Sequence, residues 1–239
     1  MTLAHSYMDE VRKLLDRIAA TEMQAISRAA ALCRDAVAGD GMIWLFGTGH
    51  SQLMAIEGLH RAGGLACVSP ILGPGLSMQS GAELGSAMER LPGLASVVLD
   101  AYPVRPGDVL IVFSNSGVNA VPVEMAVAAK ARGLTVVAVQ AAAYAATAKV
   151  GPTGRKLADV ADLVIDNQGP PGDALVQAGV VRTGPASTVT GAFILNAILC
   201  EVVELLGADA PVWISSNMPG ATEHNRRLLD RYKPRSPHL

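Results

Sequence analysis

The chain has 239 residues, half of them apolar and 17% charged, with a net charge of −2 and an isoelectric point near 6.2. This apolar content is enough for a large core, which excludes disordered and fibrous proteins, and the length fits one large domain or one domain with an appendage. The slightly acidic balance and the 4% of aromatic residues argue against a nucleic-acid partner, because such a partner is usually held by a basic face and by aromatic stacking.

The chain begins with a helical pattern over residues 3–37, in which apolar side chains recur at every third or fourth position. The pattern stops at Gly39-Asp40-Gly41, which predicts the end of a helix. We therefore expect residues 1–40 to form an N-terminal helical segment, and residues 41–239 to form the main domain together with a C-terminal helix.

Five short apolar runs follow, of the kind expected for strands that are buried on both faces of a sheet. They lie at residues 42–46, 65–68, 109–113, 135–139 and 163–165. Helical stretches separate them at residues 51–62, 82–99 and 119–132, with a shorter piece before residue 163. Strands and helices that alternate in this way form a parallel sheet with right-handed crossovers. The sequence thus predicts an α/β fold with a five-stranded, doubly wound parallel sheet and the N-terminal helix packed across it.

Two further helices are predicted near the C-terminus. Residues 189–206 are apolar around most of the helix, so we expect this helix to be buried on two sides, and residues 221–232 form an amphipathic helix. The long apolar helix and the apolar stripe of the first helix offer more hydrophobic surface than one small sheet covers. We therefore expect a homodimer or homotetramer.

The sequence shows no sign of export or membrane insertion. The N-terminus lacks a basic segment followed by an apolar run, and the longest apolar runs stop below the length of a membrane span. The three cysteines, Cys33, Cys67 and Cys200, each lie in an apolar stretch and indicate reduced packing residues rather than disulfides. We expect a cytoplasmic protein with no membrane partner.

Two loops after predicted strands have an unusual composition. The first is Gly47-Thr48-Gly49-His50-Ser51, and the second runs from Ser114 through Asn115, Ser116 and Gly117 to Asn119. Glycine lets the backbone turn tightly beside a ligand, and hydroxyls and helix N-termini offer donors to an anion. Because ligands of parallel sheets bind at the carboxyl ends of the strands, the two loops together predict a phosphate site without a lysine.

Other phosphate and nucleophile motifs fail at identifiable positions. The chain has no Gly-Lys-Ser/Thr tripeptide for a P-loop, Gln52 stands where a dinucleotide motif needs its third glycine, and Leu53 stands where a hydrolase elbow needs glycine. The alternative is that the serines and asparagines are ordinary helix caps. Two such loops at successive crossovers favour a ligand site.

The two loops resemble the signature of the sugar isomerase (SIS) domain family, GxGxS after the first strand and SxSGx with a polar residue after the third. Gly184-Pro185-Ala186-Ser187-Thr188 is similar to a segment in the isomerase domain of glucosamine-6-phosphate synthase. Residues 61–64, 107–126 and 187–198 resemble uncharacterised bacterial proteins with a single SIS domain, and phosphoheptose isomerase is a more distant match. The resemblance covers nearly the whole chain and implies a flavodoxin-like strand order.

The resemblance implies a phosphosugar site. It places Ser51, Ser114, Ser116 and Asn119 on the phosphate, with Asn119 in place of the usual threonine, and Ser187 near the sugar hydroxyls. The full predicted binding set is Gly47, Gly49, His50, Ser51, Ser114, Asn115, Ser116, Gly117, Asn119, Ser187 and Thr188. Asp173 is a further candidate for the hydroxyls, or simply a turn residue.

Aldose–ketose isomerisation needs a base that moves a proton between two carbons and a group that helps to open the ring. Phosphoheptose isomerases carry a glutamate where this chain has Arg61 and a metal-ligand histidine where it has Glu57. Glu57 with His60 is only weak evidence for a metal on residue types, and we expect neither metal nor cofactor. We expect Glu223 to be the base and His224 or His60 to assist ring opening. Glu57 is the alternative base, although Arg61 one turn away would lower its pKa, and His50 is a third candidate beside the ligand.

We therefore expect a phosphosugar-binding protein that acts as an aldose–ketose isomerase. A non-catalytic sugar-phosphate sensor or regulatory subunit is one alternative, because SIS domains also occur in transcriptional regulators. A sugar-phosphate lyase or etherase is another, ranked lower because the etherases of this superfamily carry a glutamate where Arg61 stands.

Overall fold

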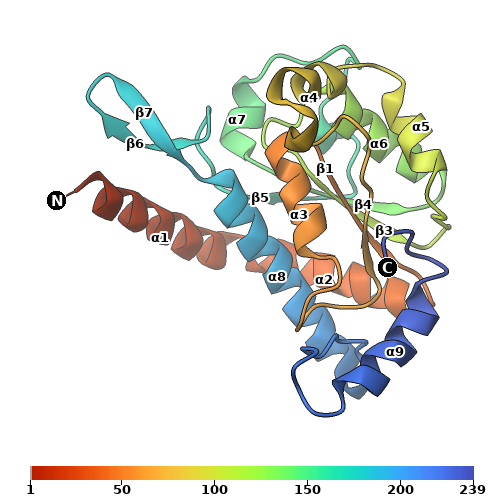
Figure 1. Ribbon diagram of the computed structural model, residues 1–239. Helices are drawn as coiled ribbons and strands as arrows, with labels where there is room; N and C mark the ends of the chain where they lie inside the picture. The colour runs from red at the N-terminus through yellow and green to blue at the C-terminus, as the bar shows by residue number, and fades with distance from the viewer. Residues whose placement is uncertain (1) are drawn as a thin grey trace.

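The computed structural model describes residues 2–239 and shows a parallel sheet between layers of helices (Figure 1). The strands are β1 (Ile43–Gly47), β2 (Val68–Pro70), β3 (Val109–Phe113), β4 (Thr135–Gln140) and β5 (Leu163–Asp166). They pair in the order β2-β1-β3-β4-β5, and every neighbouring pair is parallel. This is the flavodoxin-like order 2-1-3-4-5, which confirms the predicted fold class.

Helices cover both faces of the sheet. The long helices are α1 (Leu3–Thr21), α2 (Met23–Ala38), α6 (Ala120–Ala131), α8 (Ser187–Leu206) and α9 (Ala221–Tyr232), and the short ones are α3 (Gln52–Glu57), α4 (Ala82–Met88), α5 (Leu94–Asp100) and α7 (Ala142–Thr147). Helix α2 crosses β1, β3 and β5 and packs against α8, which also contacts α3. On the other side of the sheet α6 packs against β3, β4 and α5, as right-handed crossovers to opposite edges require.

The predicted single helix over residues 3–37 is two helices that meet at Glu22. The break has a tertiary cause, because the Glu22 carboxylate accepts hydrogen bonds from the backbone of Asp166 and the side chain of Gln168 at the end of β5. Only α2 therefore packs across the sheet. Helix α1 projects from the body in Figure 1.

The projecting helix is accompanied by a hairpin that the sequence pattern did not predict, formed by β6 (Ala174–Ala178) and β7 (Val181–Pro185). The Tyr7 hydroxyl of α1 donates to the carbonyl of Pro185 at 2.9 Å. The ring of Tyr7 lies against Gly184, where a Cβ would come within 2.6 Å of it. The hairpin is thus held to α1, and the two form an arm.

Three smaller predictions need correction. The second strand begins at Val68 rather than residue 65, because Leu65 bridges Val212 and the Ala66 amide donates to Pro211. The helix expected over residues 51–62 ends at Glu57 because Gly58 packs directly against the β1 side chain of Leu45. The helix expected over residues 82–99 is α4 and α5, separated at Gly93, whose φ of +85° is left-handed.

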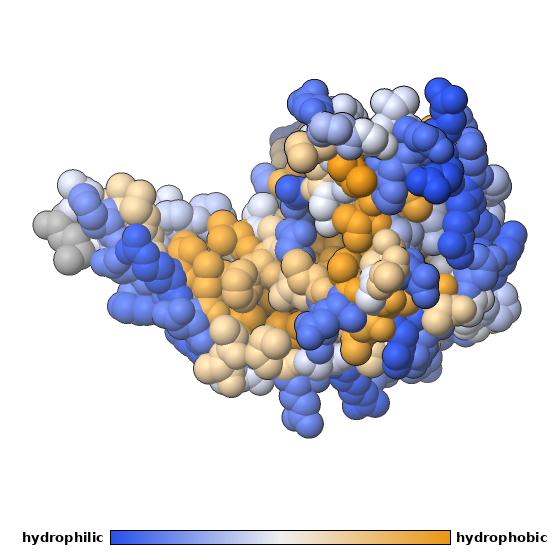
Figure 2. Space-filling model, turned by 90° about the horizontal axis from the view of Figure 1, so that it is seen from below, coloured by the Kyte–Doolittle hydropathy of each residue, from blue (hydrophilic) through white to orange (hydrophobic). Residues whose placement is uncertain are grey.

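Helix α8 has the length and apolar composition of a membrane span, contrary to the expectation that the apolar runs are too short. In the structure one face of it packs against α2 and α3 and is buried. The opposite face is open in one chain, where Val189 and Phe193 are each 37% exposed, so the prediction of burial on two sides is wrong for the single chain. Figure 2 shows apolar residues gathered beside the projecting arm. The cytoplasmic location stays a prediction.

The three cysteines have different surroundings. Cys33 and Cys67 are buried in the core, and loss of solvation raises the pKa of the Cys67 thiol to about 12. Both are therefore packing residues, as the sequence indicated. Cys200 is also a free cysteine, as expected, but it lies exposed on α8, so the prediction that it is a packing residue is wrong.

The C-terminal segment is anchored by a buried ion pair. Arg235 donates two hydrogen bonds to the carboxylate of Asp108, at 3.1 and 2.9 Å, and both side chains are at least nine-tenths buried. Asp108 also accepts from the Met42 amide and the Trp44 indole. The residues after α9 are thereby fixed to β1 and to the start of β3.

Candidate functional site

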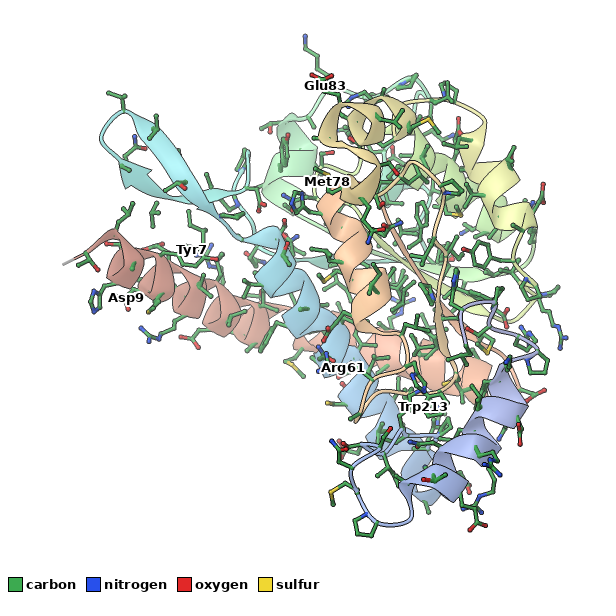
Figure 3. All side chains as sticks on the ribbon, in the orientation of Figure 1. Tyr7, Asp9, Arg61, Met78, Glu83 and Trp213 are labelled. Carbon is green, nitrogen blue, oxygen red and sulfur yellow. The ribbon has the colours of Figure 1, made fainter. Side chains whose placement is uncertain are left out.

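A pocket opens at the carboxyl ends of the central strands, where open α/β sheets bind their ligands. It is lined by His50, Ser51, Met54, Phe113, Ser114, Asn115, Val139, Asn167, Ser187, Thr188 and Gly191. The volume that it encloses is small, about 10 Å³, and the space beyond it is open to solvent. Figure 3 labels Met78, which lies beside the start of α3 at this end of the molecule.

The first loop brings Ser51 to the pocket through a tight glycine turn. Gly47 ends β1, and a Cβ there would come within 2.4 Å of the Ser51 carbonyl oxygen, a distance that no side chain permits. Gly49 has a φ of +56°, in the left-handed region that glycine adopts without strain. The local sequence thus shapes this turn, and His50 and Ser51 line the pocket beyond it.

The second loop continues from β3. The Ser114 amide donates to Val139, and the Asn115 carbonyl accepts from Ala141, so the loop is tied to the end of β4. Ser114 and Asn115 line the pocket. The other predicted residues of this loop, Ser116, Gly117 and Asn119, and the glycines Gly47 and Gly49 are not among its lining residues in the described range 2–239.

The third wall is the N-terminus of α8, which supplies Ser187 and Thr188. Asp173 lies across this helix end. Its carboxylate accepts from the Ser187 amide at 2.8 Å, from the Ala186 amide at 3.2 Å and from the Ser187 hydroxyl at 2.7 Å. Asp173 therefore caps α8, and is more than the turn residue that its loop suggested.

The structure thus brings six of the predicted binding residues together from three separate segments: His50, Ser51, Ser114, Asn115, Ser187 and Thr188. Asn167, immediately after β5, lines the same pocket and is absent from the sequence-based set. No motif marks this asparagine. The one signal that could have found it is its position after the last parallel strand, where the same sheet edge ends.

Three of the four predicted catalytic residues lie elsewhere in the chain. Glu223 and His224 are on α9, and the His224 ring is 2.8 Å from the Val212 carbonyl. The His60 ring stacks edge-on against Trp213 with centroids 4.6 Å apart. Figure 3 shows Trp213 near α9, far from the start of α3. Helix α8, about 30 Å long for its 20 residues, separates this region from the pocket within one chain.

Glu57 is nearer, at the C-terminal end of α3, one turn beyond the pocket residue Met54. Its carboxylate pairs with Arg61 and accepts from the Asn196 amide at 3.2 Å. The salt pair that the spacing of Glu57 and Arg61 predicts is therefore formed, although Arg61 lies beyond the end of α3. Glu57 is not among the residues that line the pocket in the described chain.

The pocket offers neutral hydrogen-bonding groups. Among its lining residues in the range 2–239, His50 is the sole titratable one. The same range contains no cluster of three or more His, Cys, Asp or Glu side chains suited to a metal ion. Within these residues the hydroxyls of Ser51 and Ser114 donate to no protein group, whereas the Ser187 hydroxyl is bound to Asp173. The first two are therefore available to a ligand.

Comparison with known proteins agrees with this architecture. Residues 6–141 match the SIS domain family. A UPF0309 protein of Brucella anthropi is 43% identical over 237 residues, which cover 98% of this chain and 97% of that protein.

Solved structures are similar in fold at lower identity. Phosphoheptose isomerase from Neisseria gonorrhoeae aligns with 84% of this chain and 97% of its own, with a TM-score of 0.55 and 19% identity. The Vibrio vulnificus NanR protein, solved with ManNAc-6P, aligns with 98% of this chain and 69% of its own, with a TM-score of 0.52 and 14% identity.

The family match covers more than half of the chain, and the Brucella relative covers nearly all of it. The strand order β2-β1-β3-β4-β5 and the two loops at its carboxyl edge are the features that the SIS resemblance implied. This chain therefore belongs to the SIS domain family, among the bacterial UPF0309 proteins.

Proposed function

We propose that this protein binds a phosphorylated sugar in the pocket at the carboxyl ends of β1, β3 and β4. The observation that carries the proposal is the convergence of the unused hydroxyls of Ser51 and Ser114, from two different loops, in one small neutral pocket. Hydroxyl and backbone donors at helix N-termini suit a phosphate group. A ligand held without lysine or arginine is released readily after turnover, because neutral donors bind phosphate less strongly than charged ones. The NanR neighbour, which carries ManNAc-6P, supports the same class of ligand.

The reaction that fits this site best is aldose–ketose isomerisation, and phosphoheptose isomerase among the neighbours of similar fold supports it. Of the candidates for proton transfer, His50 alone lines the pocket. An imidazole can both accept and return a proton near neutral pH. We therefore favour His50 over Glu57, and over Glu223, which reaches a pocket only if a second copy of the chain brings it there.

Replacement of His50 by Gln is expected to slow isomerisation about 10²- to 10⁴-fold, the usual effect of losing a general base, with phosphosugar binding retained. Exchange of solvent deuterium into C1 and C2 of the sugar, followed by NMR, measures the step directly. Glu223→Gln is the matched control and is expected to leave the rate unchanged. Full activity in His50→Gln with a large loss in Glu223→Gln would identify Glu223 as the base. A loss of activity confined to Glu57→Gln would identify Glu57 as the base.

A non-catalytic sensor is the second candidate, favoured by the single titratable group in the pocket and by a neighbour of similar fold from Sphaerobacter thermophilus, an RpiR transcription factor. A thermal-shift screen with sugar phosphates and the corresponding free sugars identifies the ligand in either case. Proton exchange on the bound sugar then separates the two functions, because a sensor leaves the sugar protons in place.

We also propose that the protein is a homodimer or homotetramer. The outer face of α8 exposes Val189 and Phe193, and α3 beside it exposes Leu53 at 45% and Ile56 at 43%, so two neighbouring helices present apolar side chains near the pocket mouth. Burial of such a patch is the usual reason for association. Sedimentation at micromolar concentration is expected to give at least twice the 24.7 kDa of one chain. A single species of 24.7 kDa would contradict this proposal.

A further inference from the structure

Hydrogen bonds connect Gly169, Asn167 and Asn115, the last of which lies in the loop after β3. The Gly169 amide donates to Oδ1 of Asn167 at 2.9 Å, and Nδ2 of Asn167 donates to Oδ1 of Asn115 at 2.9 Å. Asn167 is 3% exposed, and its backbone amide is tied to the Gln140 carbonyl. Neither asparagine owes its conformation to a ligand, because both side chains are held by the protein.

These hydrogen bonds fix which end of the Asn167 and Asn115 side-chain amides faces the pocket. A backbone N–H can only donate, so the group of Asn167 that meets Gly169 is the oxygen, and its NH₂ must point to Asn115. The group of Asn115 that receives this NH₂ is then also an oxygen. The Asn115 NH₂ is left without a protein partner among residues 2–239, on a residue that lines the pocket.

The wall formed by the N-terminus of α8 has the reverse polarity. A carboxylate only accepts hydrogen bonds, so the Ser187 hydroxyl must donate its single hydrogen bond to Asp173. Toward the pocket this hydroxyl therefore offers lone pairs. The same carboxylate occupies the position at the α8 N-terminus that an anion would otherwise take.

We propose that Asn167 and Asp173 are positioning residues that give the pocket a donor end at Asn115 and an acceptor end at Ser187. The inference rests on the proposed function and sets the orientation of its ligand. An acceptor-only group, the phosphate, lies at the loop of Ser114 and Asn115, and a hydroxyl of the sugar donates to Ser187. The pocket thus takes ligands that carry both a phosphate and a hydroxyl group.

Two nearly isosteric substitutions test the two ends separately. In Asn167→Asp the new carboxylate still accepts from Gly169 and no longer donates to Asn115, so the Asn115 amide turns its NH₂ toward residue 167. Binding of both inorganic phosphate and a phosphosugar is expected to weaken at least about 10-fold, because one hydrogen bond to a charged group is lost and the new carboxylate repels the phosphate. In Asp173→Asn the cap on α8 is retained, because asparagine caps as well as aspartate, and the new NH₂ donates to Ser187. The ratio of phosphosugar affinity to inorganic phosphate affinity is expected to fall about 10-fold, because the loss of the Asp173 charge acts on the phosphate of both ligands alike.

Asn225→Asp is the matched control for Asn167→Asp. The Asn225 side chain also holds backbone groups, the amide and the carbonyl of Ile214 at 3.0 and 2.7 Å, and it lies on α9 away from the pocket. The Asn225→Asp variant loses one hydrogen bond donated by a side-chain NH₂. Its thermal unfolding therefore reports the loss of stability that such a substitution causes away from the pocket. Affinity for inorganic phosphate, measured by NMR titration, is expected to be unchanged in this variant.

A second measurement decides the amide orientation whether or not a phosphosugar binds. In ¹⁵N-labelled wild-type protein the side-chain NH₂ of Asn167 is expected to exchange slowly with solvent and that of Asn115 rapidly. Slow exchange at Asn115, or wild-type affinity for inorganic phosphate in Asn167→Asp, would overturn the inference. Wild-type protein that binds no phosphosugar while the Asn115 NH₂ exchanges rapidly would instead refute the proposed function.

Discussion

The double substitution Ser51→Ala with Ser114→Ala is expected to lower the affinity for a phosphorylated sugar by about 10²- to 10⁴-fold. Each serine brings one hydroxyl to the pocket from a separate loop, and a hydrogen bond to a charged group contributes about 1.5 to 3 kcal/mol, of which 1.4 kcal/mol corresponds to tenfold in binding. Isothermal titration calorimetry with the best phosphosugar of the thermal-shift screen measures the change.

The stability of this variant is expected to stay close to that of the wild type, because neither hydroxyl donates to a protein group among residues 2–239. Ser6→Ala with Ser96→Ala is the matched control. The Ser6 hydroxyl donates to the Thr2 carbonyl at 3.4 Å and the Ser96 hydroxyl to the Gly93 carbonyl at 3.0 Å, and neither serine lines the pocket. Equal affinity in the pocket variant and the control would show that the phosphate does not lie between Ser51 and Ser114.

Arg235→Ala is expected to lower the free energy of unfolding by about 3 to 5 kcal/mol, the cost of leaving a buried charge without its partner. The Asp108 carboxylate is 1% exposed, and Arg235 supplies two of its hydrogen bonds. Loss of the guanidinium also frees the C-terminal residues from the sheet. Equilibrium unfolding in urea, followed by circular dichroism, measures the effect.

Arg231→Ala is the matched control for this prediction. Arg231 lies on α9, four residues before Arg235, and its ion pair with Asp40 is exposed, at 55% and 78% for the two side chains. An exposed pair contributes at most about 1 kcal/mol. If both variants lose equally little stability, the interaction of Arg235 with Asp108 does not anchor the C-terminus.

The fold could be predicted from the sequence because its signals are local. Continuous apolar runs such as 109–113 are typical of strands that are buried on both faces, and β3 (Val109–Phe113) is fully buried. The break at Glu22 could not be predicted, because its cause is a contact with β5 that lies 144 residues away in the chain. The hairpin β6–β7 was missed for a similar reason, since it is held by Tyr7 of α1.

The candidate site was predictable where its residues stand in loops after strands. Ser114 follows β3 directly and Ser51 stands in the short turn after β1, and the parallel order brings the two strand ends together. The catalytic prediction for Glu223 rested on residue types beside a glycine turn, and such a pattern contains no information about distance. Asn167 carries no motif, and its role depends on the Gly169 and Asn115 contacts that only the folded chain forms.

A crystal structure of the protein with a bound phosphosugar would locate the phosphate directly. We expect the phosphate within hydrogen-bond distance of the Ser51 and Ser114 hydroxyls and of the Asn115 NH₂, with a sugar hydroxyl toward Ser187. A phosphosugar bound elsewhere, or bound in this pocket with its phosphate at Ser187 and Asp173, would contradict it.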